Sequence, residues 1–156
     1  MKDPHRAGRY ERAYEQLRDL IEGQSPNLIA AMATICAVLH AKMIPQLFWT
    51  GFYFAESEDR MTVGPYQGTV ACQVLEGHGV CLHCVRTRQA VVVPDVEQFP
   101  GHIACDWRSK SEICVPVIKG DRVVAVLDID SDHLDQFDQD DVAPLERILS
   151  LLQSYL

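Results

Sequence analysis

The chain has 156 residues, 22 of them acidic and 14 basic, and a formal net charge of −8. This length predicts one domain overall, with residues 1–24 as an N-terminal helix and tail and residues 25–156 as the globular body. The acidic balance argues against a nucleic-acid binder and against docking on anionic membrane. We expect a soluble cytoplasmic protein, because no apolar run could span a bilayer and the first residues lack a signal-peptide core.

Two helices are predicted first. Apolar residues at helical spacing, including Leu17 and Leu20, indicate a helix over Tyr10–Glu22. A second, alanine-rich helix is expected to start at a Ser25 cap and to continue through Leu39. Its predicted buried stripe comprises Ile29, Met32, Ile35, Cys36 and Leu39.

A hairpin is predicted next, from the aromatic strand Phe48–Phe54 and a second strand that ends near Gly64 and Pro65. Further along, Val80–Arg88 indicates a short helix and Val91–Val93 a short strand, with a loop over Val96–Asp106. The chain closes with a hairpin and a helix. These last elements are strands over Ile113–Ile118 and Val123–Ile129, a tight turn at Gly120, and a helix capped by Asp138 with Val142, Leu145, Ile148, Leu149 and Leu152 on one face.

This order of elements predicts an α+β fold. Consecutive hairpins favour a central antiparallel sheet, and the terminal helices are expected to pack mainly on one of its faces.

The six cysteines divide into two groups. Cys36 and Cys114 lie in apolar runs, which is typical of buried structural thiols. The other four lie at strand ends, turns or loops: Cys72, Cys81, Cys84 and Cys105. Cys81 and Cys84 form a C-x-x-C, a weak signal that leaves zinc binding with nearby histidines (His78, His83, His102) and redox chemistry both open.

The loop around Cys105 has the richest surroundings. It reads Pro100–Asp106, and a reactive thiol there would need exposure and a lowered pKa. Three nearby side chains could stabilise a thiolate or could simply be solvated loop residues: His102, Arg108 and Lys110.

Three carboxylates are predicted to converge. Asp128 and Asp130 share one face of a strand because they are two residues apart, and Glu112 precedes the apolar run of the paired strand. The cluster indicates either an amine-binding, proton-donating site or solvated strand ends.

Several motifs together resemble the GAF-domain free methionine-R-sulfoxide reductases. The resemblance covers about residues 25–155, and it implies that residues 25–156 form a single GAF domain. Its motifs are Trp49–Tyr53, Gly64–Gln73, Gly77–Cys81, Val93–Val96, Pro100–Asp106, Ser111–Ile113 and Leu127–Asp130.

The resemblance implies a GAF-like antiparallel sheet, usually in a homodimer, and reduction of free L-methionine-(R)-sulfoxide. It implies that Cys105 is the nucleophile, Cys72 the principal resolving thiol and Cys81 a third family cysteine. The substrate amino group and sulfoxide oxygen would be held by three acids: Glu112, Asp128 and Asp130. Trp49 matches the aromatic residue near the substrate methyl group. The reaction would pass through a sulfenic acid and a disulfide that thioredoxin reduces, and it requires no cofactor or metal.

The chain departs from the family pattern at four positions: Leu82 for glycine, Cys84 as an extra thiol, Trp107 for a small residue and Cys114 for an aliphatic residue. Trp107 is expected to narrow the pocket or to close over it. Two alternatives stay open, a non-catalytic GAF module that senses a small molecule, and a zinc protein that uses Cys81 and Cys84.

Overall fold

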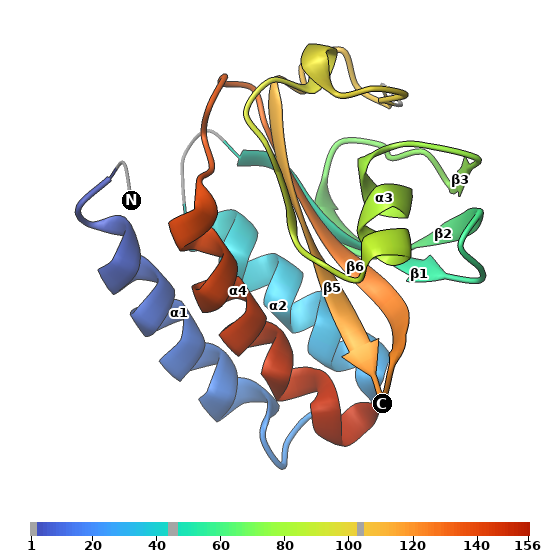
Figure 1. The fold of residues 1–156 in the computed structure, drawn as a ribbon. Helices are drawn as coiled ribbons and strands as arrows, with labels where there is room; N and C mark the ends of the chain where they lie inside the picture. The colour runs from blue at the N-terminus through green and yellow to red at the C-terminus, as the bar shows by residue number, and fades with distance from the viewer. Residues whose placement is uncertain (1–2, 44–46, 103–104) are drawn as a thin grey trace.

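The computed structural model describes residues 3–43, 47–102 and 105–156. It contains one antiparallel sheet with helices on both faces (Figure 1). The helices are α1 (Arg6–Ile21), α2 (Leu28–Lys42), α3 (Val80–Thr87) and α4 (Val142–Leu149). The strands are β1 (Leu47–Ala55), β2 (Arg60–Gly68), β3 (Val74–Glu76), β4 (Val91–Val93), β5 (Ser111–Lys119) and β6 (Arg122–Ser131). Short 3₁₀ turns are η1 (Val96–Gln98), η2 (Gln139–Asp141) and η3 (Ser150–Tyr155).

The sheet has the strand order β3-β2-β1-β6-β5-β4, so the α+β class and the antiparallel sheet are confirmed. Strand β3 was not predicted, because three residues carry too little pattern. Strand β2 continues to Gly68, beyond its predicted end at Pro65. Proline is tolerated there because β3 pairs only with the start of β2, around Met61, and leaves the rest at the sheet edge.

Helices α2 and α4 cover one face of the sheet, and α1 packs on the outer side of both, so that the three helices bury the larger core (Figure 1). Two residues of the predicted stripes are exposed instead, Leu20 at 45% and Ile29 at 51%. Helix α2 turns Ala31 and Met32 to the core, and Ile29 lies about 200° from Ala31 around the helix axis. Along α1 the buried row passes through Leu17 and leaves Leu20 outside.

Both predicted helix starts are wrong, for local reasons. Helix α2 is capped by Asn27 rather than Ser25, since the Asn27 side chain accepts a hydrogen bond from the Ala30 amide. Helix α1 begins before Tyr10, at Arg6, whose guanidinium donates to Asp141 at 2.8 Å. The Tyr10 hydroxyl donates to the other Asp141 oxygen at 2.9 Å, so one buried carboxylate anchors the first turns of α1.

The last helix also differs from its prediction. Asp138 caps η2 rather than a long helix, and α4 ends at Leu149, where η3 continues. Four of the five residues predicted for its apolar face are buried: Leu145, Ile148, Leu149 and Leu152. None of the helices in the described part of the chain is long and apolar enough to cross a membrane.

Strands β5 and β6 position the functional side chains by alternation. Ile113 and Val115 of β5 enter the large core, whereas Glu112 and Cys114 face the other side of the sheet. Across the ladder Glu112 pairs with Asp130, and Cys114 pairs with Asp128. Helix α3 lies over this second face (Figure 1).

Candidate active site

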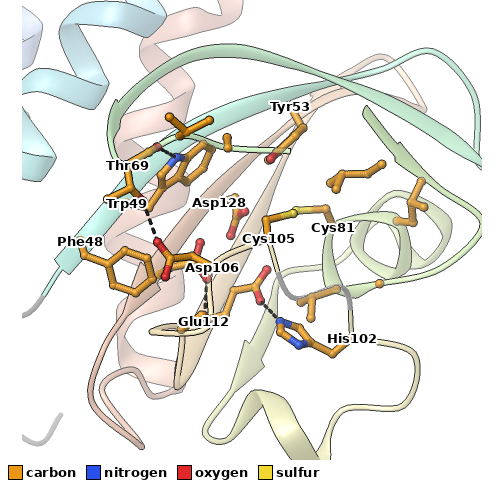
Figure 2. A pocket seen from close by; sticks show the side chains of 18 of the residues that line it. Phe48, Trp49, Tyr53, Thr69, Cys81, His102, Cys105, Asp106, Glu112 and Asp128 are labelled. Atoms are coloured by element: carbon orange, nitrogen blue, oxygen red, sulfur yellow. Dashed lines mark hydrogen bonds and ion pairs between the residues drawn. The ribbon is translucent and has the colours of Figure 1, made fainter. Parts of the chain in front are cut away.

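A pocket opens on the α3 side of the sheet and has a volume of about 570 Å³, counting its open mouth (Figure 2). It is lined from β1, the loop after β2, the start of α3, the loop before β5, and strands β5 and β6. Every residue predicted for the site except Cys72 lines this pocket: Trp49, Cys81, Cys105, Glu112, Asp128 and Asp130.

The three predicted acids meet at the floor of the pocket. Glu112 and Asp128 are 5% and 6% exposed and share a hydrogen bond. Burial, together with Asp130, raises the pKa of Glu112 to about 8. Burial and Glu112 raise the pKa of Asp128, and burial and Asp128 raise that of Asp130. The cluster therefore retains protons at neutral pH and can donate one.

His102 contacts this carboxyl cluster, and it does not supply a positive charge that would stabilise a Cys105 thiolate. Its Nε2 lies 3.6 Å from the Glu112 Oε2 (Figure 2). Burial lowers the pKa of His102, so its imidazole is neutral at pH 7. The neutral His102 ring therefore lies beside the Glu112 carboxyl without adding a positive charge that would favour loss of its proton.

A disulfide joins Cys72 to Cys105 at the pocket mouth, with 5.5 Å between the two Cα atoms. Cys105 is exposed and Cys72 is half-buried, so a dithiol in solution can reach the bond. The Tyr53 hydroxyl donates to the Cys72 carbonyl at 3.0 Å, which holds one side of the bridge. Ile103 and Ala104 of the predicted Cys105 loop lie outside the described residues.

Asp106 anchors the loop that carries Cys105. Arg108 donates to both Asp106 oxygens, at 3.0 and 2.7 Å, and the Thr69 hydroxyl donates at 3.0 Å. These hydrogen bonds hold the pKa of Asp106 well below its ordinary value, and the bonds from Arg108 have the largest effect. Arg108 therefore forms its ion pair with Asp106, and the expectation that it stabilises a thiolate is not supported. Trp107 is 82% exposed and does not line the pocket, so the expectation that it closes over the site is wrong.

Trp49 forms the aromatic wall of the pocket. Its ring stacks on Tyr53 and Tyr66, with centroid distances of 5.6 and 5.3 Å, and its Nε1 donates to the Thr69 carbonyl at 3.1 Å. The Trp49 ring lies over Gly51, where a Cβ would come within 2.4 Å of the indole. Only glycine at this position allows the indole to lie flat against the strand.

Four free cysteines are buried among the described residues: Cys36, Cys81, Cys84 and Cys114. The Cys81 and Cys114 sulfurs are 3.5 Å apart, below the pocket acids. The hydrogen bond with Cys114 favours a Cys81 thiolate, but burial and the nearby acids raise the Cys81 pKa overall. Cys84 is not among the described residues whose donor atoms could surround a metal ion, so the C-x-x-C zinc interpretation is not supported.

Sequence reasoning missed the residues that position the site, above all Tyr53 and Thr69. Tyr53 had a usable signal, since it is four residues from Trp49 on a strand and must share its face. Thr69 had no usable signal in the sequence, because its hydrogen bond to Asp106 joins two loops through residues that are 37 positions apart.

A family model for the GAF domain matches residues 28–156. GAF domain-containing protein A of Dictyostelium discoideum is 41% identical over 146 residues, which make up 93% of this chain and 90% of that protein. Free methionine-R-sulfoxide reductase of Escherichia coli is 36% identical over 88% of this chain and 82% of its own length. The crystallised free methionine-R-sulfoxide reductase from Neisseria meningitidis, in complex with its substrate, superposes with a TM-score of 0.89. It is 35% identical, and the match covers 96% of this chain and 89% of that one.

Proposed function

Because the chain belongs to the GAF domain family, and within it to the free methionine-R-sulfoxide reductases, we propose that it reduces free L-methionine-(R)-sulfoxide through Cys105. The observation that carries the proposal is a reachable Cys72–Cys105 disulfide at the mouth of a pocket floored by three proton-retaining acids. The reductase chemistry needs a nucleophilic thiol, a proton donor and a resolving thiol, and these residues can supply all three.

The first step is attack of the reduced Cys105 thiolate on the sulfoxide sulfur. The cluster around Glu112 supplies a proton to the sulfoxide oxygen, the bond between that oxygen and the methionine sulfur breaks, and the oxygen passes to the Cys105 sulfur as a hydroxyl group. The methionine sulfur is reduced by two electrons and methionine leaves, while Cys105 is oxidised to a sulfenic acid. The Cys72 thiol then displaces water from that sulfenic acid and forms the disulfide. A dithiol reductant, which we propose is thioredoxin, restores both thiols by exchange. Per turnover, one sulfoxide and one dithiol become one methionine, one water and one disulfide.

Specificity for the free amino acid follows from the same acids. The ammonium group of free methionine sulfoxide can pair with Asp128 or Asp130, while a neighbouring carboxyl keeps its proton for the oxygen. A peptide-bound residue lacks the ammonium group and would leave buried carboxyl groups unpaired, which is costly. Trp49 offers an apolar face to the substrate methyl group.

The requirement for a reducing dithiol favours the cytoplasm as the site of the reaction. We keep the homodimer as part of the proposal, and light scattering of the purified chain tests it. A mass of one chain in solution would remove the dimer and leave the chemistry unaffected.

The decisive assay offers the reduced protein three substrates in parallel: free methionine-(R)-sulfoxide, the free S epimer and a peptide-bound sulfoxide. Methionine release from the first alone is expected. Cys105→Ser should abolish even the first methionine per enzyme, whereas Cys72→Ser should release one methionine and then fail to cycle with thioredoxin. Cys36→Ala, which removes a thiol from the helix core, is the matched control and should cycle normally. Full single turnover by Cys105→Ser would refute the nucleophile, and no turnover on any substrate would favour the ligand-binding module.

The role of Cys81 needs its own test. Its burial and its contact with Cys114 argue for a supporting part in resolution rather than the principal one. Cys81→Ala should therefore keep most thioredoxin-driven cycling. Loss of cycling equal to that of Cys72→Ser would make Cys81 an obligatory member of the relay.

A further inference from the structure

Two thiols and two carboxyl groups gather at the floor of the pocket, and all but Cys114 line it: Cys81, Glu112, Cys114 and Asp128. Each offers one donor atom, and the four atoms lie within 4.8 Å of one another, all on buried side chains. We propose that this group, the buried tetrad, binds one thiophilic divalent cation such as Zn²⁺. The site needs Cys114, a departure from the family pattern, and it does not use Cys84 of the C-x-x-C.

The spacing of the donor atoms fits a tetrahedral zinc site. Zinc–sulfur bonds of about 2.3 Å and zinc–oxygen bonds of about 2.0 Å place two sulfurs about 3.8 Å apart and a sulfur and an oxygen about 3.5 Å apart. The two tetrad sulfurs are 3.5 Å apart. The Cys114 sulfur lies 3.3 Å from a Glu112 oxygen and 3.6 Å from an Asp128 oxygen. A cation could therefore enter with small side-chain shifts, and its binding would release the protons of the thiol and carboxyl ligands to solvent.

The surroundings also suit a metal site. Cys81, Glu112 and Asp128 line the open pocket, which gives an ion a path from solvent. The Glu112 Oε1 faces Cys114 and is placed to bind the cation. The Glu112 Oε2 lies beside the His102 ring, which orients the carboxyl group. Two sulfur donors select zinc, cadmium or cobalt over magnesium and calcium, which prefer oxygen donors alone.

Metal binding has a consequence that rests on the proposed function. Glu112 and Asp128 would be ligands of the cation and also partners of the sulfoxide, so the two occupants exclude one another. Cys72 and Cys105 are not in the tetrad, so the oxidised protein should bind the cation as well. Zinc would then act as a competitive inhibitor.

Cobalt(II) tests the site without any activity measurement. The full-length oxidised protein, stripped with a chelator, is titrated with Co²⁺ and followed by visible and near-ultraviolet absorption. One Co²⁺ per chain with tetrahedral and sulfur charge-transfer bands is expected, and stoichiometric Zn²⁺ should erase them. Cys114→Val should lose the bands, whereas the matched control Cys84→Ala, which removes a buried thiol outside the tetrad, should keep them.

Glu112→Gln serves as a second variant, because it keeps side-chain size and should weaken cobalt binding even if Cys114→Val misfolds. Absence of thiolate bands in the wild-type protein, or their persistence in a folded Cys114→Val protein, would overturn the proposal.

Reductase kinetics then test the inhibition. At a free zinc concentration ten times its dissociation constant, competition raises the apparent KM for the sulfoxide about 11-fold. The same zinc should leave the KM of Cys114→Val near its metal-free value. A protein that binds cobalt but reduces no sulfoxide would refute the proposed function and support the metal site. A protein that reduces the sulfoxide but shows no thiolate bands would support the proposed function and refute the metal site.

Discussion

Replacing Glu112 by glutamine should make the protein more stable at alkaline pH. The folded protein raises the pKa of Glu112 from 4.5 to about 8, so the proton on Glu112 stabilises the fold. That stabilisation is complete when the pH is below the pKa of Glu112 in the unfolded chain, and it is lost as the pH rises through about 8. A difference of about 3.5 pH units corresponds to about 5 kcal/mol, lost at up to about 1.4 kcal/mol per pH unit. Glutamine keeps the size of the side chain and cannot ionise, so the variant escapes this loss.

Urea unfolding from pH 5 to pH 9 measures the effect. The buffers contain a chelator, which keeps the buried tetrad free of metal, and no reductant, which keeps the disulfide intact. The two proteins should be similarly stable near pH 5, and Glu112→Gln should exceed the wild type by several kcal/mol near pH 9. The exposed Glu58 offers a control, since Glu58→Gln removes the same charge and should run parallel to the wild type. Parallel curves for Glu112→Gln as well would refute the raised pKa.

The proposed mechanism draws its proton from the cluster around Glu112, so kcat/KM for the free sulfoxide should fall above about pH 8, and a flat profile to pH 9 would exclude this cluster as the proton donor. Asp141→Ala should lower the free energy of unfolding by about 3–5 kcal/mol in a denaturant titration, because Arg6 would stay buried without its partner. The double variant with Arg6→Met should regain part of this loss, and equal losses in the two would disprove the pairing argument. Gly51→Ala should displace the Trp49 indole, which tryptophan fluorescence reports, and raise KM more than it lowers kcat. An unchanged KM would remove Trp49 from the substrate pocket.

Most of the architecture was predictable because it depends on local pattern. The aromatic run of β1, the hairpin closed at Gly120 and the alternation along β6 each carry their periodicity in consecutive residues. The convergence of Glu112 with Asp128 and Asp130 followed from the same alternation plus one hairpin. Strand β3 was missed because its pairing with β2 holds it, and its three residues show no pattern of their own.

The details that escaped prediction depend on contacts between distant segments. The start of α1 is determined by a carboxylate about 135 residues away, at Asp141. The loop before Trp107 is anchored in part by the hydrogen bond from Thr69 to Asp106, which joins residues 37 positions apart and has no local sequence pattern. Cys114 was correctly expected to be buried in a strand, but its contact with Cys81 required the position of α3 over the sheet.

The division of β5 and β6 into two faces has a consequence for how this protein can change over generations. Side chains such as Ile113 and Leu127 pack into the larger core on one face, while Glu112 and Asp128 line the pocket on the other. A mutation on the pocket face can alter the chemistry of the pocket with little disturbance of the larger core, so selection can act on the two properties separately. Cys114 lies on the pocket face of β5, where a change of side chain can add or remove a donor atom while the opposite face of the strand still packs in the larger core.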